Sequence, residues 1–199
     1  MSCFGSYVAG NADLAACISD KGKGELMRKV TFGGANSVDN FIARENDDVD
    51  WLTWSPEVSE ITRQFWKTID TVVMGRRTYD VAAKAGSTPY PGVKNYVFSR
   101  TLKKSAVKGT EVVSEDAATF VNKLKIKKGK GICVIGGGVL AKSLFEANLI
   151  DEIGLNIHPV LLSSGIPLFY EMTKQIDLKL IECKPLKNGC VFLKYEVKH

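Results

Sequence analysis

Residues 136–138 are the part of this chain whose composition best suits an anion-binding site. Three consecutive glycines follow the apolar, β-prone run 132–135, and a helical pattern of apolar residues comes after them. Glycine lets the backbone approach a ligand closely, and a helix start offers free N–H groups at the positive end of its dipole. We interpret the stretch as a phosphate or pyrophosphate site. A tight turn without a ligand is the alternative.

Guanidinium and hydroxyl groups stand at two further strand ends. Five residues of this kind and one glycine follow the β-prone runs 71–74 and 96–98: Gly75, Arg76, Arg77, Thr78, Ser99 and Arg100. In open α/β sheets, ligands bind beyond the carboxyl ends of the strands. The glycines and the arginines are therefore expected to meet around a polyphosphate nucleotide, although any one arginine alone is more often a solvated surface residue.

Motif spacing narrows the class of nucleotide. No G-x-G-x-x-G follows the first predicted strand, and no acidic residue ends the second to hold a ribose 2′-hydroxyl. Arginines in that place suit a 2′-phosphate and so favour NADPH. The chain contains neither a G-x-x-x-x-G-K-[ST] loop nor a G-x-S-x-G elbow, so NTP hydrolysis and serine esterase chemistry have no support.

Composition excludes several other classes of function. The 199 residues are 45% hydrophobic and 25% charged, which is typical of a soluble globular domain. There is no apolar run of about eighteen residues and no secretory signal, so we expect a cytoplasmic protein without a membrane partner. Five cysteines without C-x-x-C spacing and two histidines predict no metal site.

Five lysines lie close together, but without interleaved aromatic residues they indicate a solvated helix end and not nucleic-acid binding: Lys123, Lys125, Lys127, Lys128 and Lys130.

The predicted elements alternate between strand and helix and then close with a hairpin. Ser55 and Ser114 are expected to cap helices, and Asn188-Gly189 predicts a hairpin turn. Strands are expected at 30–32, 71–74, 96–98, 111–113, 132–135, 152–159, 176–183 and 190–197. This order predicts an α/β fold: a mixed, mostly parallel eight-stranded sheet with helices on both faces and a C-terminal antiparallel hairpin. Residues 1–26 show no period, so we expect a flexible N-terminal extension before a domain spanning 27–199.

Several motifs together resemble the dihydrofolate reductase superfamily. They are VVMGRRTY at 72–79, VFSRT at 97–101 and VIGGG at 134–138. Four more are similar to its RibD C-terminal branch: SVDNFIA at 37–43, LIDE at 149–152, PVLL at 159–162 and GIPLF at 165–169. The resemblance covers residues 27–197 and implies the dihydrofolate-reductase-like fold.

The resemblance also implies roles for individual residues. The nicotinamide side of NADPH is expected at Ala35, Ile42 and Ala43. Its phosphates are expected at Gly75, Arg76, Arg77, Thr78, Ser99 and Arg100. The turn over the cofactor corresponds to Ile135, Gly136, Gly137, Gly138 and Val139. Trp51 and a position near Ile61 correspond to the substrate side. Asn156 corresponds to a polar position facing the substrate pocket.

The resemblance implies an NADPH-dependent reductase that transfers hydride to a C=N bond of a pteridine or pyrimidine-type small molecule. The expected reaction is similar to that of dihydrofolate reductase or of 5-amino-6-(5-phosphoribosylamino)uracil reductase. A homodimer is also expected. Asp39 is the leading candidate for the proton donor and Glu57 the second; a solvated acid is the alternative for each. The zinc deaminase motifs of a complete RibD protein are absent. The competing hypothesis is a protein that binds NADPH without turnover.

Overall fold

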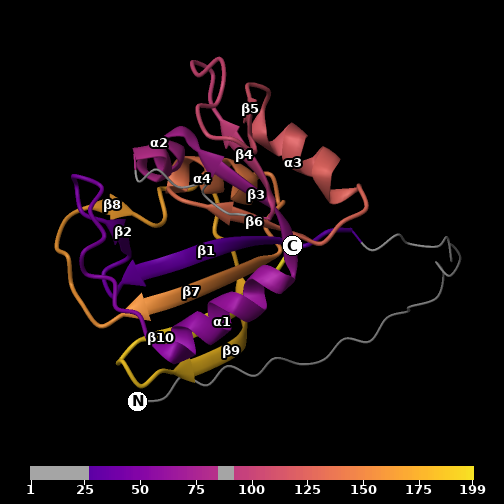
Figure 1. The fold of residues 1–199 in the computed structure, drawn as a ribbon. Helices are drawn as coiled ribbons and strands as arrows, with labels where there is room; N and C mark the ends of the chain where they lie inside the picture. The colour runs from indigo at the N-terminus through magenta and orange to yellow at the C-terminus, as the bar shows by residue number, and fades with distance from the viewer. Residues whose placement is uncertain (1–26, 85–91) are drawn as a thin grey trace, which may run out of the picture.

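One eight-stranded sheet organises the computed structural model, which describes residues 27–84 and 92–199 (Figure 1). The expected extension 1–26 therefore lies outside the described residues. The strand order is β5-β4-β3-β6-β1-β7-β10-β9. The strands are β1 (Val30–Ser37), β3 (Ile69–Gly75), β4 (Lys94–Phe98), β5 (Thr110–Val113), β6 (Gly131–Ile135), β7 (Glu152–His158), β9 (Leu178–Pro185) and β10 (Val191–Val197).

Strand directions confirm the predicted fold class. The strands from β5 through β7 pair in parallel, whereas β10 runs antiparallel to both β7 and β9. The closing hairpin forms at the predicted Asn-Gly turn, where Gly189 has a φ of 84°. A second, two-stranded sheet pairs β2 (Phe41–Ala43) with β8 (Ile166–Pro167). These two strands were not predicted, because segments this short carry no readable period.

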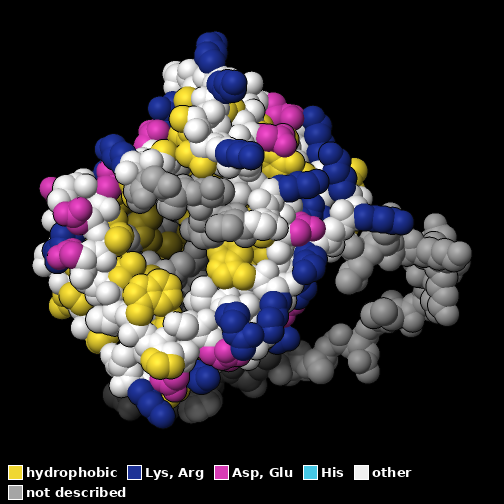
Figure 2. Space-filling view, viewed as in Figure 1, with side chains coloured by type: hydrophobic (Ala, Val, Ile, Leu, Met, Phe, Trp, Pro, Cys, Tyr) yellow, Lys and Arg dark blue, Asp and Glu magenta, His cyan; other side chains and the backbone are white. Residues whose placement is uncertain are grey.

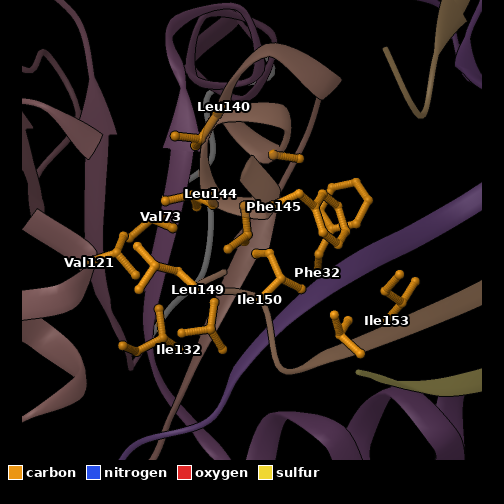
Figure 3. Close-up of a cluster of buried hydrophobic side chains, with 14 of the residues drawn as sticks. Phe32, Val73, Val121, Ile132, Leu140, Leu144, Phe145, Leu149, Ile150 and Ile153 are labelled. Atoms are coloured by element: carbon orange, nitrogen blue, oxygen red, sulfur yellow. The ribbon is translucent and has the colours of Figure 1, made fainter. Parts of the chain in front are cut away.

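Helices cover both faces of the sheet because its central strands alternate in the direction of their apolar side chains. Val73, Ile132 and Val134 face a core shared with α3 (Ala117–Lys125) and α4 (Gly138–Glu146) (Figure 3). Their neighbours Val72 and Cys133 face the opposite core, which α1 (Pro56–Lys67) and α2 (Arg76–Lys84) cover. Central parallel strands are buried on both faces, so continuous apolar runs were their signal.

Helix starts follow from side-chain caps. Ser55 caps α1 as predicted, and its Oγ accepts a hydrogen bond from Val58 N at 3.2 Å. The predicted cap of α3 at Ser114 is wrong, because Asp116 holds that place. The Asp116 carboxylate accepts hydrogen bonds from both Thr119 N and Thr119 Oγ1 at 2.8 Å.

The first strand does not stop at residue 32 as predicted but continues through Ser37. Gly33 pairs in register with Gly154 of β7. A Cβ atom at Gly33 would lie 1.8 Å from the Gly154 carbonyl oxygen, so only glycine allows this approach. Gly33 therefore allows β1 and β7 to pair closely, and the strand carries Ala35 to the carboxyl edge of the sheet.

Candidate functional site

A cleft of about 1030 Å³ opens at the carboxyl ends of β1, β3, β4 and β6. Figure 2 shows a hollow lined with hydrophobic side chains on the side of the molecule that carries α2, β2 and β8 in Figure 1. The cleft brings together all the predicted cofactor residues except Gly138: Ala35, Ile42, Ala43, Gly75, Arg76, Arg77, Thr78, Ser99, Arg100, Ile135, Gly136, Gly137 and Val139. Residues far apart in the sequence thus form one wall.

The glycine turn passes close to the first turn of α2. Gly136 has a φ of 88°, and a Cβ atom there would lie 1.8 Å from Thr78 Oγ1. Gly137 precedes α4 and offers no side chain to cap it, so the first amide groups of that helix have no side-chain acceptor at this position. Gly138 is buried beneath Tyr170, where a Cβ atom would lie 2.1 Å from the ring. Gly138 therefore serves packing, and its two neighbours line the cleft.

The three cleft arginines differ in their partners. Arg76 pairs with Asp80 one turn along α2 at 2.7 Å. Arg77 pairs with Asp47 at 2.6 Å, across to the loop that follows β2. Arg100 is exposed and has no ion-pair partner among residues 27–84 and 92–199. The cleft therefore carries at least one guanidinium that can accept an anion without first releasing a carboxylate.

Sequence reasoning missed part of the cleft wall. Leu168 and Tyr170 line it next to the glycine turn, and Val49 and Leu52 line it from the loop before α1. Leu168 belongs to the GIPLF motif, which supported the family resemblance but had been given no role. Apolar residues distant from the strand ends carried no chemical signal, so only the tertiary structure brings them here.

The two predicted proton donors do not line the cleft. Asp39 accepts hydrogen bonds from Ser37 Oγ at 2.6 Å, Ser163 N at 2.8 Å and Leu162 N at 3.1 Å. The bond from Ser37 and those from the two backbone amides lower the pKa of Asp39. Glu57 accepts a hydrogen bond from Lys187 N at 2.8 Å and so links α1 to the closing hairpin. Both carboxylates are engaged with loops in this structure.

A smaller pocket of about 30 Å³ adjoins Ala35 and contains the predicted Asn156 together with His158, which had no predicted role. Asn156 Nδ2 lies 3.1 Å from His158 Nε2, and Thr53 N lies 3.4 Å from His158 Nδ1. Burial lowers the pKa of His158. Since His158 is 2% exposed and alternates with Asn156 along β7, the strand period was the signal that could have found it.

The predicted substrate residues lie beside this smaller pocket or away from it. The Trp51 ring is buried edge-on against His158, with ring centroids 5.3 Å apart. Ile61 packs instead against the apolar cluster of Val58, Leu186 and Cys190 under the hairpin. Ile61 is therefore not brought to either pocket.

Two further features bear on the class of protein. Within the part of the chain that the structure describes, no cluster of His, Cys, Asp or Glu could hold a metal ion. None of the described helices is long and apolar enough to cross a bilayer. A doubly covered, mostly parallel sheet with a ligand-sized cleft at its carboxyl edge defines an α/β protein with a candidate ligand site.

Comparison with known proteins gives the family. Residues 28–192 match the model of the RibD C-terminal domain, and the chain therefore belongs to the RibD C-terminal domain family. The uncharacterized protein YwjB of Bacillus subtilis (strain 168) is 35% identical over 157 residues, which are 78% of this chain and 90% of YwjB.

Solved structures share the fold. A candidate riboflavin biosynthesis protein from Shewanella sp. PV-4 superposes with a TM-score of 0.75 at 24% identity, over 86% of this chain and 99% of that one. Dihydrofolate reductase from Enterococcus faecalis, in complex with NADP(H), gives a TM-score of 0.61 at 20% identity, over 86% and 97% of the two chains. The chain thus has the dihydrofolate-reductase-like fold.

Proposed function

We propose that this protein is an NADPH-dependent reductase that transfers hydride to a C=N bond of a pteridine or pyrimidine-type substrate. The observation that carries the proposal is the convergence, in one cleft, of a glycine turn, the starts of α2 and α4, and three arginines. Free amide groups and guanidinium groups are the usual partners of phosphate. Membership of the RibD C-terminal domain family supports the same class of reaction.

The cleft residues fit a dinucleotide with an additional phosphate. The volume of about 1030 Å³ lies just above the range of roughly 300–1,000 Å³ usual for ligand pockets. Gly136 brings backbone close to Thr78 without a side chain between them. Arg76, Arg77 and Arg100 supply positive charge along the same wall. When bound, the nicotinamide would supply the hydride.

The protein's own residues would supply position and a route for the proton. Ala35 lines both the cleft and the smaller pocket, and it pairs in register with Asn156. A substrate ring beside Asn156 would therefore lie next to the nicotinamide wall. An amide can bond a substrate nitrogen but cannot protonate it at neutral pH, so Asn156 orients the ring. The lowered pKa of Asp39 keeps its carboxyl group ionised at neutral pH, so a water molecule would deliver the proton and the Asp39 carboxylate would orient that water.

The second candidate function is NADPH binding without turnover. It is favoured by the engagement of Asp39 and Glu57 with loops, which leaves neither predicted proton donor on the cleft wall. A fluorescence titration with NADPH, followed by an NADPH oxidation assay with dihydrofolate and with the riboflavin-pathway pyrimidine, separates the two functions. Oxidation with either substrate supports the reductase. Binding with no oxidation supports the alternative, and no binding rejects both.

Cofactor choice provides a second test. A hydrogen bond to a charged group is worth roughly 1.5–3 kcal/mol, and 1.4 kcal/mol is about a factor of ten. Arg77→Ala should therefore weaken NADPH binding by about tenfold and hardly change NADH binding. Arg63→Ala is the matched control, because Arg63 pairs with Glu60 on α1 and does not line the cleft. Equal losses for both cofactors would assign Arg77 to the pyrophosphate or to the fold.

A further inference from the structure

One ion pair spans the mouth of the cleft. Arg77 belongs to the first turn of α2, and Asp47 belongs to the loop 44–50 that follows β2; both line the cleft. Arg77 Nε donates to Asp47 Oδ1 at 2.6 Å, and Arg77 Nη2 donates to the Glu45 carbonyl oxygen at 3.2 Å. A single loop therefore occupies two of the donors that Arg77 would offer to an anionic ligand.

The loop holds this carboxylate in place. Asp47 N donates to the Arg44 carbonyl oxygen at 3.0 Å, and Arg44 N donates to the Asp48 carbonyl oxygen at 2.9 Å. The Arg44 guanidinium bonds both Asp50 oxygens, at 2.7 and 3.2 Å. Asp47 itself has a φ of 72°, in the left-handed region that few side chains other than Asn and Asp adopt readily. The loop hydrogen bonds and the backbone conformation of Asp47 thus direct its side chain toward α2.

The Arg77–Asp47 pair is also exposed enough for another anion to replace Asp47 as the partner of Arg77. The Arg77 and Asp47 side chains are 58% and 32% exposed, and ion pairs in water are weak. A phosphate group carries more negative charge than a carboxylate and forms strong charge-assisted bonds with a guanidinium. A phosphorylated ligand can therefore take Arg77 from Asp47, whereas an uncharged ligand cannot.

We propose that Asp47 is a specificity-determining residue that competes with the ligand for Arg77. Because a phosphate group must first displace the Asp47 carboxylate, Asp47 lowers the affinity of the cleft for phosphorylated nucleotides and leaves that for their unphosphorylated forms unchanged. This inference rests on the proposed nucleotide-binding function and extends it to the loop after β2. Removing the carboxylate relieves the competition and leaves Arg77 in place.

The test compares Asp47→Asn with Asp48→Asn. Asparagine tolerates the positive φ at residue 47. Asp48 is the next residue in the same loop; it carries the same charge, forms no hydrogen bond or ion pair with Arg77 and does not line the cleft. Calorimetric titration with 2′,5′-ADP should show roughly two- to fivefold tighter binding for Asp47→Asn only, the span expected for an exposed ion pair. Adenosine binding should stay unchanged. Equal gains in the two variants, or no gain, would overturn the proposal.

A second measurement needs no ligand. Amide hydrogen exchange in residues 44–50 should quicken in Asp47→Asn, because the loop loses its tie to α2, and should keep the wild-type rate in Asp48→Asn. Unchanged exchange in both variants would contradict the competition directly. If exchange responds as expected but neither 2′,5′-ADP nor NADPH binds to any form of the protein, the proposed function fails while the tie between Asp47 and Arg77 stands.

Discussion

Adjacent glycines in the turn after β6 have different physical roles. Gly136 combines a φ of 88° with a Cβ position 1.8 Å from Thr78 Oγ1. Gly137 has a φ of −60°, and a Cβ atom there would meet nothing within 4 Å. The sequence alone treats the two as equivalent, whereas the structure requires glycine only at the first.

Gly136→Ala should therefore destabilise the protein and Gly137→Ala should not. A left-handed backbone costs an alanine roughly 1–2 kcal/mol, and displacing Thr78 adds to that. Urea denaturation should show a fall of at least 1 kcal/mol in the free energy of unfolding for Gly136→Ala. A change within about 0.5 kcal/mol is expected for Gly137→Ala, as for other substitutions that create no clash. Equal stability of the two variants would contradict this account of the turn.

His158 is a buried titratable group next to the smaller pocket. Burial lowers its pKa below the ordinary value of 6.5. The unfolded chain therefore binds a proton on this side chain at a higher pH than the folded protein does. By linkage, the folded state loses stability as the pH falls through about 6.5 and the unfolded state becomes protonated.

The difference in the free energy of unfolding between pH 7.5 and pH 5.5 should thus be smaller in His158→Gln than in the wild type. Urea denaturation at the two pH values measures it, and contributions from other groups cancel in the comparison. A wild-type dependence in His158→Gln would show that His158 does not titrate differently on unfolding.

At the scale of elements, one buried lysine joins α3 to the starts of β1 and β7. Lys125 is 6% exposed, and its Nζ lies 2.8 Å from both Asp151 carboxylate oxygens and 3.3 Å from the Leu149 carbonyl oxygen. Asp151 Oδ2 also accepts a hydrogen bond from Val30 N at 2.7 Å. Interpreting the whole lysine run as a solvated helix end was therefore wrong for Lys125, because its charge is matched inside the fold.

Lys125→Met should cost about 3 kcal/mol, near the lower end of the range for breaking a buried pair, because it leaves the Asp151 charge unpaired. Lys123→Met is the matched control on the same helix, since Lys123 pairs with Glu115 in solvent. That variant should change the free energy of unfolding by less than about 0.5 kcal/mol. Thermal or urea denaturation measures both, and equal effects would mean that burial of Lys125 adds no stability.

At the scale of the whole molecule, the strand order assembles the site. β3 and β6 are neighbours in the sheet, although α2, β4, β5 and α3 separate them along the chain. This pairing places the arginines after β3 beside the glycines after β6. Parallel pairing also brings their carboxyl ends to the same edge, which is where α/β proteins bind ligands.

Among the described residues, the cleft is lined entirely from within 33–170. A chain that begins at Met27 should therefore bind NADPH with unchanged affinity in a fluorescence titration. This prediction also tests the expected domain boundary, because residues 27–199 must fold alone for the result to hold. A loss of tenfold or more in affinity, with circular dichroism showing a folded chain, would mean that residues 1–26 contribute to the site.

The sequence by itself determined the fold class and most of the strand-end residues that line the cleft. Buried parallel strands appear as continuous apolar runs, and a glycine or arginine directly after such a run must lie at the carboxyl edge. The position of Gly136, Arg77 and Ser99 directly after such runs was therefore enough to place the three residues together. Asn156 could be placed by the period of two along β7.

Only the tertiary structure decided where isolated polar residues lie. Asp39 and Glu57 are acids near strand and helix ends, yet loops distant in sequence supply their hydrogen-bond donors. Asp47 forms an ion pair with Arg77, thirty residues away in the sequence, and Lys125 forms one with Asp151, twenty-six residues away. Such pairs depend on how loops and helices pack in three dimensions, and a single sequence carries no periodic signal for them.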